Sequence, residues 1–487
     1  MRVAVIGGGL AGITAAIALA ETGSAVTLLE ARPRLGGATC SFTRDGLVVD
    51  TGQHVFLGCC TAYRGLLGRL GMTARAPLQD RFDVTVLAPG PAGQVRRGRL
   101  RRTALPGPLH MLPALARYPF LSLAERSVVT RPALAMRRVD PADPVVDEQR
   151  FGDWLAARGQ SDRARRALWD LFTVSALNIA GDDASLALAA TVVKTGLLGR
   201  NNAADIGIPA LPLGELHGDA AATLLANLGA RVLIGAKVSA INNAPENPDR
   251  DLAPGDPSRS RFRLSLASDQ ALPAEMPADA VVLAVPHEAA ARLIPPGALP
   301  DEAVAGWAGL GASPIVNVHV IYDRPVTDVP FAAAVDSPVQ WVFDRTRISG
   351  LDRSSATKRQ YLAISLSAAD EYVDVPAASL AERFVPALAD LFPAARDAQV
   401  TEFFVTRERR ATFRQAPGTG RLRPRAATRL PGLVLAGAWT ATGWPDTMEG
   451  AVRSGLTAAI ELGKTVLGPQ RAGTQPNVLT STMGVRQ

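Results

Sequence analysis

The sequence predicts an α/β protein that begins with a Rossmann-type strand–helix–strand unit. The apolar run Val3–Ile6 is followed at once by a glycine cluster and by small apolar residues at helical spacing. A second apolar stretch, residues 25–30, ends in an acidic residue. Near the C-terminus, residues 433–452 are rich in glycine, carry almost no charge and run into another helix of small residues. The first two observations predict the unit, and the third raises the question of what the C-terminal glycines contact.

The N-terminal glycines have the spacing of a dinucleotide-binding turn. In G-x-G-x-x-G, the first glycine permits the turn, the second lets the backbone approach a diphosphate, and the third lets helix and strand pack closely. The helix N-terminus then offers free N–H groups and a positive dipole to the phosphates. A secretory signal is the alternative for this stretch, but the glycine spacing favours the turn. The predicted diphosphate contacts are Gly7, Gly8, Gly9, Leu10, Ala11 and Gly12.

The second strand ends in Glu30, which lies 18 residues after Gly12. A carboxylate at this position accepts hydrogen bonds from a ribose diol and favours an unphosphorylated adenosine ribose. The chain continues with "ARPRLGGAT" (31–39), where Arg32 can reach phosphate or ribose and Gly36–Gly37 brings more backbone close to the cofactor. The stretch "VVDTGQHVFLG" (48–58) follows. A nicotinamide dehydrogenase needs no such extension.

This extension resembles the amine-oxidase and phytoene-desaturase group of flavoproteins, in which it lines bound FAD. In that group the chain returns to the first domain at its C-terminus, so residues 433–437 meet the ribityl chain and a helix starting near Met448–Glu449 points at the flavin. A helix N-terminus stabilises the anion of reduced flavin. Glycines 437, 443, 450 and 455 are expected to admit the flat ring, with ordinary strand-to-helix packing as the alternative. The further FAD-binding residues implied by the resemblance are Ala31, Arg32, Gly36, Gly37, Gly52, Gln53, His54, Val238, Gly437, Ala438, Thr447 and Met448.

The resemblance implies an amine-oxidase-like fold: a Rossmann-type FAD-binding domain, a mixed-sheet substrate domain and a helical subdomain. The expected FAD-binding domain is discontinuous and comprises residues 1–75, 230–290 and 425–467. Residues 76–229 form a helical lid and part of the substrate domain, and residues 291–424 form the rest of the substrate domain. Residues 468–487 have the composition of a disordered tail.

Four stretches resemble the hydroxysqualene dehydroxylases, flavoproteins of hopanoid biosynthesis: "LWDLFTVSALNIAGDDAS", "PIVNVHVIYDRPV…VQWVFDR", "RERRATFRQAPG" and "AWTATGWPDTMEGAVRSG". The resemblance implies reductive removal of the hydroxyl of hydroxysqualene, giving squalene at the expense of reduced FAD. The chain departs from the family at Ala438, where an acid usually bonds the ribityl chain, and at Ala38, Thr51 and Cys60. Each lost hydrogen bond weakens FAD binding by about 1 kcal/mol. An FAD-binding protein without turnover is therefore a non-enzymatic alternative.

Removal of an allylic hydroxyl needs a proton donor, an apolar cavity that tolerates a cation, and a hydride. The candidate catalytic residues are His54, which otherwise only bonds backbone or flavin, and Asp446, which otherwise caps a helix. The candidate substrate-binding residues are Asn178, Trp341 and Trp444, although a tryptophan commonly packs in a core. The other histidines show no metal-binding spacing, so no metal is expected. The physiological electron donor is unknown.

Other reactions remain possible on the same fold. A carotenoid or squalene desaturase is the main alternative, because the sequence does not determine the direction of electron flow. A polyamine or amino-acid oxidase is disfavoured, because such enzymes need a polar or aromatic cage and the chain has only five tyrosines in 487 residues.

The charge distribution predicts a peripheral membrane contact. The net charge is +7, and residues 91–138 hold ten arginines, including Arg96, Arg97, Arg99, Arg101 and Arg102, against the single acid Glu125. No nucleic-acid-binding signature accompanies them. Three cysteines, two of them adjacent, indicate a reduced, cytoplasmic chain. We expect attachment to the inner face of the cytoplasmic membrane, with a solvated basic face as the alternative. The apolar residues expected at the interface are Leu109, Met111, Leu112, Leu115, Tyr118, Phe120 and Leu121.

Overall fold

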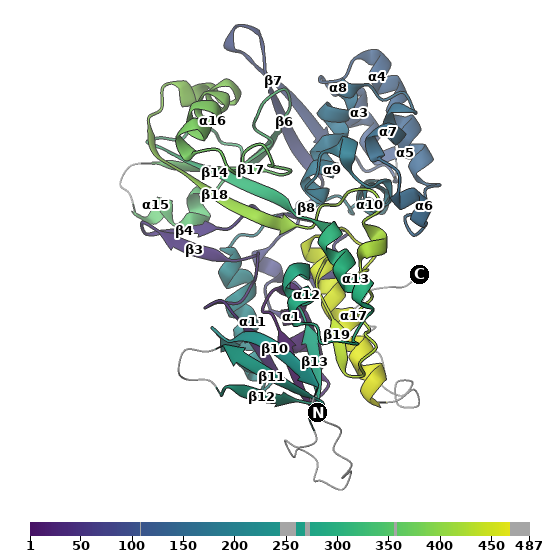
Figure 1. Ribbon diagram of the computed structural model, residues 1–487. Coiled ribbons are helices and arrows are strands. Elements are labelled where there is room, and N and C mark those ends of the chain that lie inside the picture. The colour runs from purple at the N-terminus through teal and green to yellow at the C-terminus, as the bar shows by residue number, and fades with distance from the viewer. Residues whose placement is uncertain (108, 244–259, 268–272, 355–357, 468–487) are drawn as a thin grey trace.

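A parallel five-stranded sheet forms the base of the molecule (Figure 1). The computed structural model describes residues 1–107, 109–243, 260–267, 273–354 and 358–467. The sheet has the order β19-β13-β1-β2-β9, and all its neighbouring strands are parallel. The strands are β1 (Arg2–Ile6), β2 (Ala25–Glu30), β9 (Arg231–Ile234), β13 (Ala280–Leu283) and β19 (Leu433–Leu435). The predicted α/β class is confirmed, and every strand falls within the three ranges expected for the FAD-binding domain.

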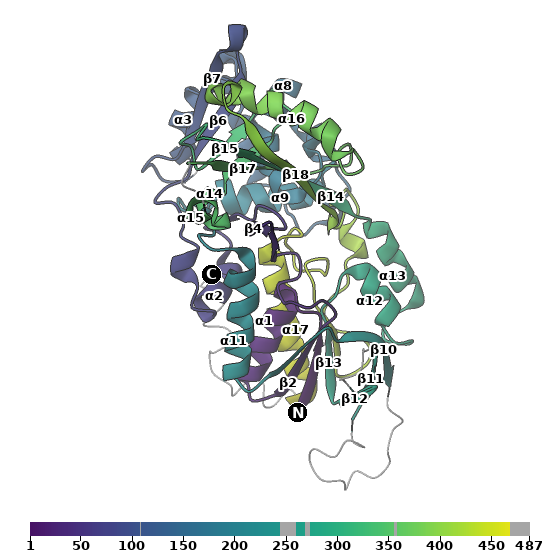
Figure 2. The ribbon, with the colours of Figure 1, turned by 90° about the vertical axis from the view of Figure 1, so that its left-hand side faces the viewer.

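Alternating side chains of this sheet enter two different cores. Val3 and Val5 pack with helices, whereas Ala4 and Ile6 pack with a second, antiparallel sheet. The helices are α1 (Leu10–Glu21), α2 (Thr61–Arg69), α11 (Ala220–Asn227) and α17 (Met448–Leu467), and Figure 2 shows α11, α1 and α17 side by side. The antiparallel sheet contains β10 (Lys237–Asn243), β11 (Phe262–Ala267) and β12 (Glu275–Ala278), and the helices α12 (His287–Leu293) and α13 (Asp301–Gly306) follow β13.

Above this base lies a mixed seven-stranded sheet of order β18-β14-β17-β16-β15-β6-β7. Only the β15–β6 pair is parallel. The long helix α16 (Ala377–Leu391) covers one face through Phe384 and Leu388, and the other face looks toward the helical subdomain. The strands are β6 (Asp83–Pro89), β7 (Val95–Arg101), β14 (Ser313–Tyr322), β15 (Phe331–Ala334), β16 (Trp341–Asp344), β17 (Gln360–Leu366) and β18 (Val400–Thr412).

Short helices and two hairpin-like ribbons complete the structure. The helical subdomain comprises α3 (Leu112–Ala116), α4 (Leu123–Val128), α5 (Thr130–Met136), α6 (Pro144–Asp147), α7 (Phe151–Ala156), α8 (Asp162–Ala164), α9 (Asp170–Leu177) and α10 (Leu186–Val192). The ribbons are β3 (Ser41–Arg44) with β4 (Leu47–Asp50), and β5 (Phe56–Leu57) with β8 (Ile206–Gly207). Two further short helices are α14 (Thr346–Ser349) and α15 (Leu351–Ser354).

The basic segment 91–138 folds differently from its expected surface arrangement. Four of the seven apolar residues expected at a membrane interface are buried, because they pack into the core of the helical subdomain: Met111, Tyr118, Phe120 and Leu121. Leu109 and Leu112 remain exposed. Arg102 is not free for lipid, because it pairs with the buried carboxylate of Asp205 at 2.6 Å.

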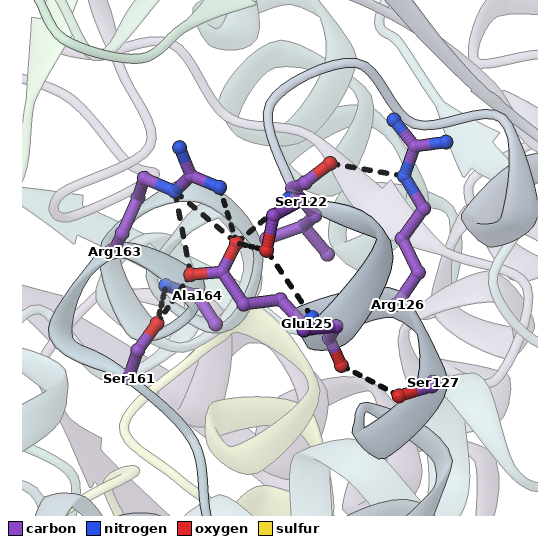
Figure 3. A network of polar contacts seen from close by, with 9 residues as sticks. Ser122, Glu125, Arg126, Ser127, Ser161, Arg163 and Ala164 are labelled. Carbon is purple, nitrogen blue, oxygen red and sulfur yellow. Dashed lines mark hydrogen bonds and ion pairs between the residues drawn. The ribbon is translucent and has the colours of Figure 1, made fainter.

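Glu125, the single acid of this segment, is held by its neighbours (Figure 3). Its carboxylate accepts hydrogen bonds from Ser122 N at 2.7 Å and Ser161 Oγ at 2.6 Å, and it pairs with Arg163. The guanidinium of Arg163 holds the pKa of Glu125 well below its usual range. The network joins α4 to α8 and neutralises the one negative charge in the segment.

The stretch 230–241 contains two strands, because Gly235 has φ +70° and turns the chain between β9 and β10. Strand β19 ends at Leu435, and Gly437, two residues later, has φ +138°.

The expected tail, 468–487, lies outside the described residues, as does most of the Pro/Asp-rich stretch 244–261. Within the part that is described, no helix combines the length and apolarity needed to cross a bilayer.

Candidate active site

The three motif glycines occupy three different environments. A Cβ on Gly7, which has φ +108°, would lie 2.3 Å from Ala284 O, and one on Gly12 would lie 1.8 Å from Gly7 O. A Cβ on Gly9 would meet only Gly37 Cα, at 3.9 Å. Gly7 and Gly12 are therefore required by close packing of the protein, whereas the space in front of Gly9 is open. No side chain caps the N-terminus of α1 beside it, so this end of the helix fits a diphosphate.

The second glycine pair lies directly against the first loop. Gly36 N donates to Gly8 O at 2.8 Å, and both Gly36 and Gly37 have positive φ. A Cβ on Gly37 would come within 2.9 Å of Gly9 Cα. The two loops form one glycine-lined cradle, and side chains at these positions would fill it.

Glu30 stabilises the glycine-lined cradle through hydrogen bonds to backbone N–H groups. Its carboxylate accepts hydrogen bonds from Gly8 N at 2.6 Å and from Arg32 N at 2.7 Å, and its side chain is buried. Each carboxylate oxygen has a second lone pair, so the predicted ribose contact stays compatible with these bonds. Ala236 N bonds to Glu30 O, which brings β10 and the predicted contact Val238 beside the end of β2. Ala31 and Arg32 are exposed at the same strand end.

The loop 51–54 joins the cradle to the seven-stranded sheet. The Thr51 hydroxyl donates to Ala38 O at 2.6 Å, which links two of the positions where the sequence departs from the family that it resembles. Asn317 Nδ2, from β14, donates to Thr51 O at 3.2 Å. The amide oxygens of Gln53 and Asn317 are both buried and have no partner in the described structure. Since buried acceptors are normally bonded, two orphaned oxygens here fit a polar ligand such as a flavin ring.

A buried ion pair that the sequence did not predict holds the loop 51–54 in place between the two sheets. Asp50, at the end of β4, pairs with Arg345, 295 residues away, and both side chains are buried. Asp50 also accepts hydrogen bonds from Ser41 Oγ at 2.6 Å and Leu213 N at 3.0 Å. Asp50 lies in the stretch 48–58 and Arg345 at the end of "VQWVFDR", but neither stretch by itself indicates that the two side chains pair.

The glycines of the C-terminal segment differ in what they contact. Gly437 N donates to Ser454 Oγ at 2.8 Å. Gly450 and Gly455 are not free to face a ring: a Cβ on Gly450 would lie 2.5 Å from Pro445 O, and one on Gly455 would lie 2.3 Å from Ala11 O in α1. The expectation for these two glycines was wrong, because they let α17 pack tightly against the protein. A Cβ on Gly443 would meet nothing within 4 Å.

Helix α17 begins at Met448, as expected, and Thr447 Oγ1 caps it by accepting from Gly450 N at 3.2 Å. Glu449, in its first turn, is buried and turned toward α2, where its carboxylate accepts from Ala62 N and Tyr63 N. Arg453 pairs with the same carboxylate at 2.7 Å. This pairing offsets a negative charge that otherwise weakens the positive end of the helix.

The two tryptophans of the segment differ in their surroundings. Trp439 is a core residue: it is buried, its indole N–H donates to Val285 O at 2.9 Å, and it packs edge-to-face on Trp307. Trp444 is half-buried, and the guanidinium of Arg453 lies 4.5 Å from its ring centroid. One face of Trp444 is therefore occupied, and its contact with substrate stays a prediction.

The two candidate acids have opposite pKa shifts. Burial lowers the pKa of His54, whose Nδ1 lies 3.2 Å from Gly52 O, so its imidazole is neutral at pH 7. Burial raises the pKa of Asp446 to about 6, and one of its oxygens accepts from Phe413 N at 2.9 Å. Asp446 therefore holds a proton more readily than an ordinary aspartate. Neither residue's catalytic role is tested by these contacts.

The predicted substrate-binding residues on the upper domains also differ. Asn178 is buried at the left-handed C-terminus of α9, and its amide bonds Ser313 O, Thr412 Oγ1 and Ala368 N, which is a bonding pattern that holds elements together. Trp341 is half-buried on β16 and stacks with Phe331 and Phe343. Both Trp341 and Asn317 pair with Ser365, so they point to the same face of the sheet, roughly 10 Å apart.

Comparisons with known proteins agree with this geometry. Residues 10–462 match the family described as "Flavin containing amine oxidoreductase". The chain therefore belongs to the flavin-containing amine oxidoreductase family and is an FAD-dependent oxidoreductase. Solved structures similar to it include a putrescine oxidase (TM-score 0.66, 20% identity, covering 95% of this chain and 99% of the other) and an oxidoreductase from Methanosarcina mazei (TM-score 0.68, 18% identity, 94% and 99%). At these identities they establish the fold alone.

Relatives by sequence include hydroxysqualene dehydroxylases and a carotene desaturase. Hydroxysqualene dehydroxylase from Rhodopseudomonas palustris is 30% identical over 462 residues, covering 93% of this chain and 96% of the relative, and the Sinorhizobium fredii enzyme is 28% identical, covering 94% and 97%. A zeta-carotene desaturase from Zea mays is 24% identical, covering 93% and 82%. The predicted resemblance to hydroxysqualene dehydroxylases is confirmed.

Proposed function

We propose that the protein removes the hydroxyl of hydroxysqualene reductively and releases squalene. The substrate loses hydroxide, which leaves as water after taking one proton, and the carbon gains a hydride. Reduced FAD, when bound, supplies that hydride. The glycine cradle and the loop 51–54 hold the cofactor, and the residues around them bind the substrate and deliver the proton.

Asp446 is the proton donor in this proposal. A carboxyl with a pKa of about 6 is protonated in a useful fraction of molecules near neutral pH, unlike an ordinary aspartate. His54, whose pKa is lowered, is a poor acid and instead orients the loop or the hydroxyl through hydrogen bonds. The similarity to hydroxysqualene dehydroxylases carries the choice of substrate, and the burial of Asp446 at the head of α17 supports its role as the acid.

The reaction also needs an apolar surface that tolerates a cation, and aromatic residues of the seven-stranded sheet offer one. Phe331, Trp341 and Phe343 stack on one another in two neighbouring strands and offer an apolar, π-rich wall. Such faces attract a cation, which here is the allylic cation left when the hydroxyl departs.

Product analysis tests the reaction and its direction. The purified protein, photoreduced without oxygen and incubated with hydroxysqualene, is expected to form squalene, detected by mass spectrometry. The oxidised protein is incubated in parallel with squalene and with phytoene. More highly unsaturated products there, with no squalene from the reduced protein, would establish the desaturase alternative that the similarity to zeta-carotene desaturases keeps open.

We also propose peripheral attachment to the inner face of the cytoplasmic membrane. A C30 hydrocarbon is nearly insoluble in water, so the enzyme must take its substrate from a bilayer or a partner. Exposed leucines gather in one part of the described chain, where their exposed fractions range from 37% to 80%: Leu105, Leu109, Leu112, Leu123 and Leu134. Within residues 117–138, four exposed arginines form no ion pair with any described residue: Arg117, Arg131, Arg137 and Arg138. Glu125, the only acid there, is already neutralised by Arg163.

Liposome flotation tests this surface with a matched control. Replacing Leu109, Leu112 and Leu123 by serine is expected to abolish flotation with anionic vesicles, and replacing the four unpaired arginines by glutamine to weaken it by about 1 kcal/mol per charge at low salt. Val145 is also exposed, at 67%, but lies between Asp143 and Asp147, so Val145→Ser should leave flotation unchanged. Equal binding of all variants, with FAD content intact, would place the membrane contact elsewhere.

A further inference from the structure

One buried side chain, Arg423, bonds several backbone carbonyls of the loop between β19 and α17. This arginine follows a short 3-10 turn, Gly420–Leu422, and its side chain is 8% exposed. No described carboxylate lies within ion-pair distance of its guanidinium, although Asp446 and Asp147 act on it electrostatically from farther away. A buried cation without a paired anion is costly unless other polar groups solvate it.

Backbone carbonyls of the loop take that role. Arg423 Nη2 donates toward Ala438 O at 2.9 Å, Thr440 O at 2.6 Å and Trp444 O at 2.8 Å, and Thr442 Oγ1 lies at 3.2 Å. Arg423 Nε adds Trp439 O at 3.3 Å. The acceptors span residues 438–444, which is the irregular stretch that joins the strand to the cap of α17.

The arrangement fixes both the shape and the electrostatics of the loop. Irregular backbone has no ladder of its own, so shared acceptors on one rigid, planar donor replace it. Burial lowers the pKa of Arg423 to about 10, so the side chain still carries its charge at neutral pH. Ala438 adds no carboxylate to the loop, and the nearest acid on it, Asp446, holds a proton more readily than usual.

We propose that Arg423 is a positioning residue that shapes the flavin-binding loop and places a fixed positive charge behind the flavin, favouring its reduced form. Reduced flavin carries more negative charge than oxidised flavin, so a nearby cation in a low-dielectric interior stabilises the reduced state more. The proposal rests on the placement of FAD against Gly437–Ala438, but it does not depend on which substrate is reduced.

Two substitutions separate shape from charge. Arg423→Gln removes the charge, and Arg423→Lys keeps it while its single ammonium cannot reach acceptors spread over seven residues. Arg421→Gln is the matched control, because Arg421 lies two residues away, is exposed and pairs with Glu148 at 2.5 Å. The measurements are FAD dissociation constants and midpoint potentials of the FAD-loaded proteins, neither of which needs a substrate.

We expect both Arg423 variants to bind FAD about tenfold more weakly, consistent with the loss of one or more charged hydrogen bonds. The midpoint potential of the bound flavin should become more negative in Arg423→Gln and stay near the wild-type value in Arg423→Lys. In Arg421→Gln, both the midpoint potential and the FAD affinity should be unchanged. An unchanged potential in loaded Arg423→Gln would overturn the charge role. If that variant does not fold, wild-type FAD affinity in Arg423→Lys would overturn the positioning role. Failure to form squalene, with these shifts present, would instead contradict only the proposed reaction.

Discussion

The two glycine-rich segments near the cofactor, residues 7–12 and 437–455, are built in different ways. In the N-terminal segment, Gly12 packs on the backbone oxygen of Gly7, five residues away, and Gly7 is the member that meets a distant residue, Ala284. In the C-terminal segment, Gly455 packs on Ala11 of another helix, and backbone carbonyls of the preceding loop accept hydrogen bonds from the Arg423 side chain. The first segment is a local motif that can be recognised wherever it occurs. The second acquires its shape from the rest of the fold, so its glycines cannot be interpreted from spacing alone.

Gly9→Val gives the largest expected effect. The new side chain enters the open space in front of the loop, which the diphosphate needs, without colliding with the protein. The variant should therefore fold with the melting temperature of FAD-free wild type and contain no detectable FAD. Gly463→Ala in α17, where a Cβ meets nothing within 4 Å, is the control and should keep its FAD. Wild-type FAD content in Gly9→Val would refute the position of the site.

Gly455→Val should show the opposite pattern. Its Cβ would lie 2.3 Å from a backbone oxygen of α1, so the helices must separate. Overpacking of this kind costs about 1–3 kcal/mol, which denaturant titration of the FAD-free protein measures. A variant as stable as wild type, but unable to bind FAD, would show that Gly455 faces the cofactor after all.

Asp446→Asn tests the chemistry at the head of the C-terminal helix. The acid form of Asp446 predominates below about pH 6, so squalene formation should be fastest there and fall as the pH rises through that value. The asparagine variant should be slower by about 10²-fold or more at low pH and lose this limb of the profile. If it kept the wild-type profile, the proton would come from another group.

Ala438→Asp gives the smallest expected effect. If a ribityl contact is merely missing in this chain, restoring the carboxylate should tighten FAD binding by about 1 kcal/mol, or roughly fivefold. Fluorescence titration of the FAD-free protein measures the change. An unchanged dissociation constant would mean that another group already fills that role.

Whether a feature could be predicted from the sequence depends on whether nearby or distant residues determine it. The glycine turn, the strand ends at Glu30 and the start of α17 at Met448 were predictable, because each depends on residues within one or two turns of chain. The Asp50–Arg345 pair and the anchoring of the loop by Arg423 were not, because their partners meet only in the folded protein.

Burial within the basic segment shows the same limit. Leu121 and Leu109 are identical in a hydropathy pattern, yet Leu121 is buried, whereas Leu109 is 46% exposed. Prolines break the helical period through this stretch, so no periodic pattern tells the two faces apart. Only the packing of the helical subdomain decides which apolar residues remain outside.

A single turnover in heavy water tests the central claim most directly. The FAD-loaded protein is photoreduced without oxygen in D2O, where the transferable hydrogen of reduced flavin exchanges with solvent, and is mixed with hydroxysqualene. The account predicts one squalene per flavin reoxidised, with one deuterium at the carbon that lost its hydroxyl. Flavin that stays reduced, or squalene that forms without deuterium, would contradict the reductive dehydroxylation proposed for this protein.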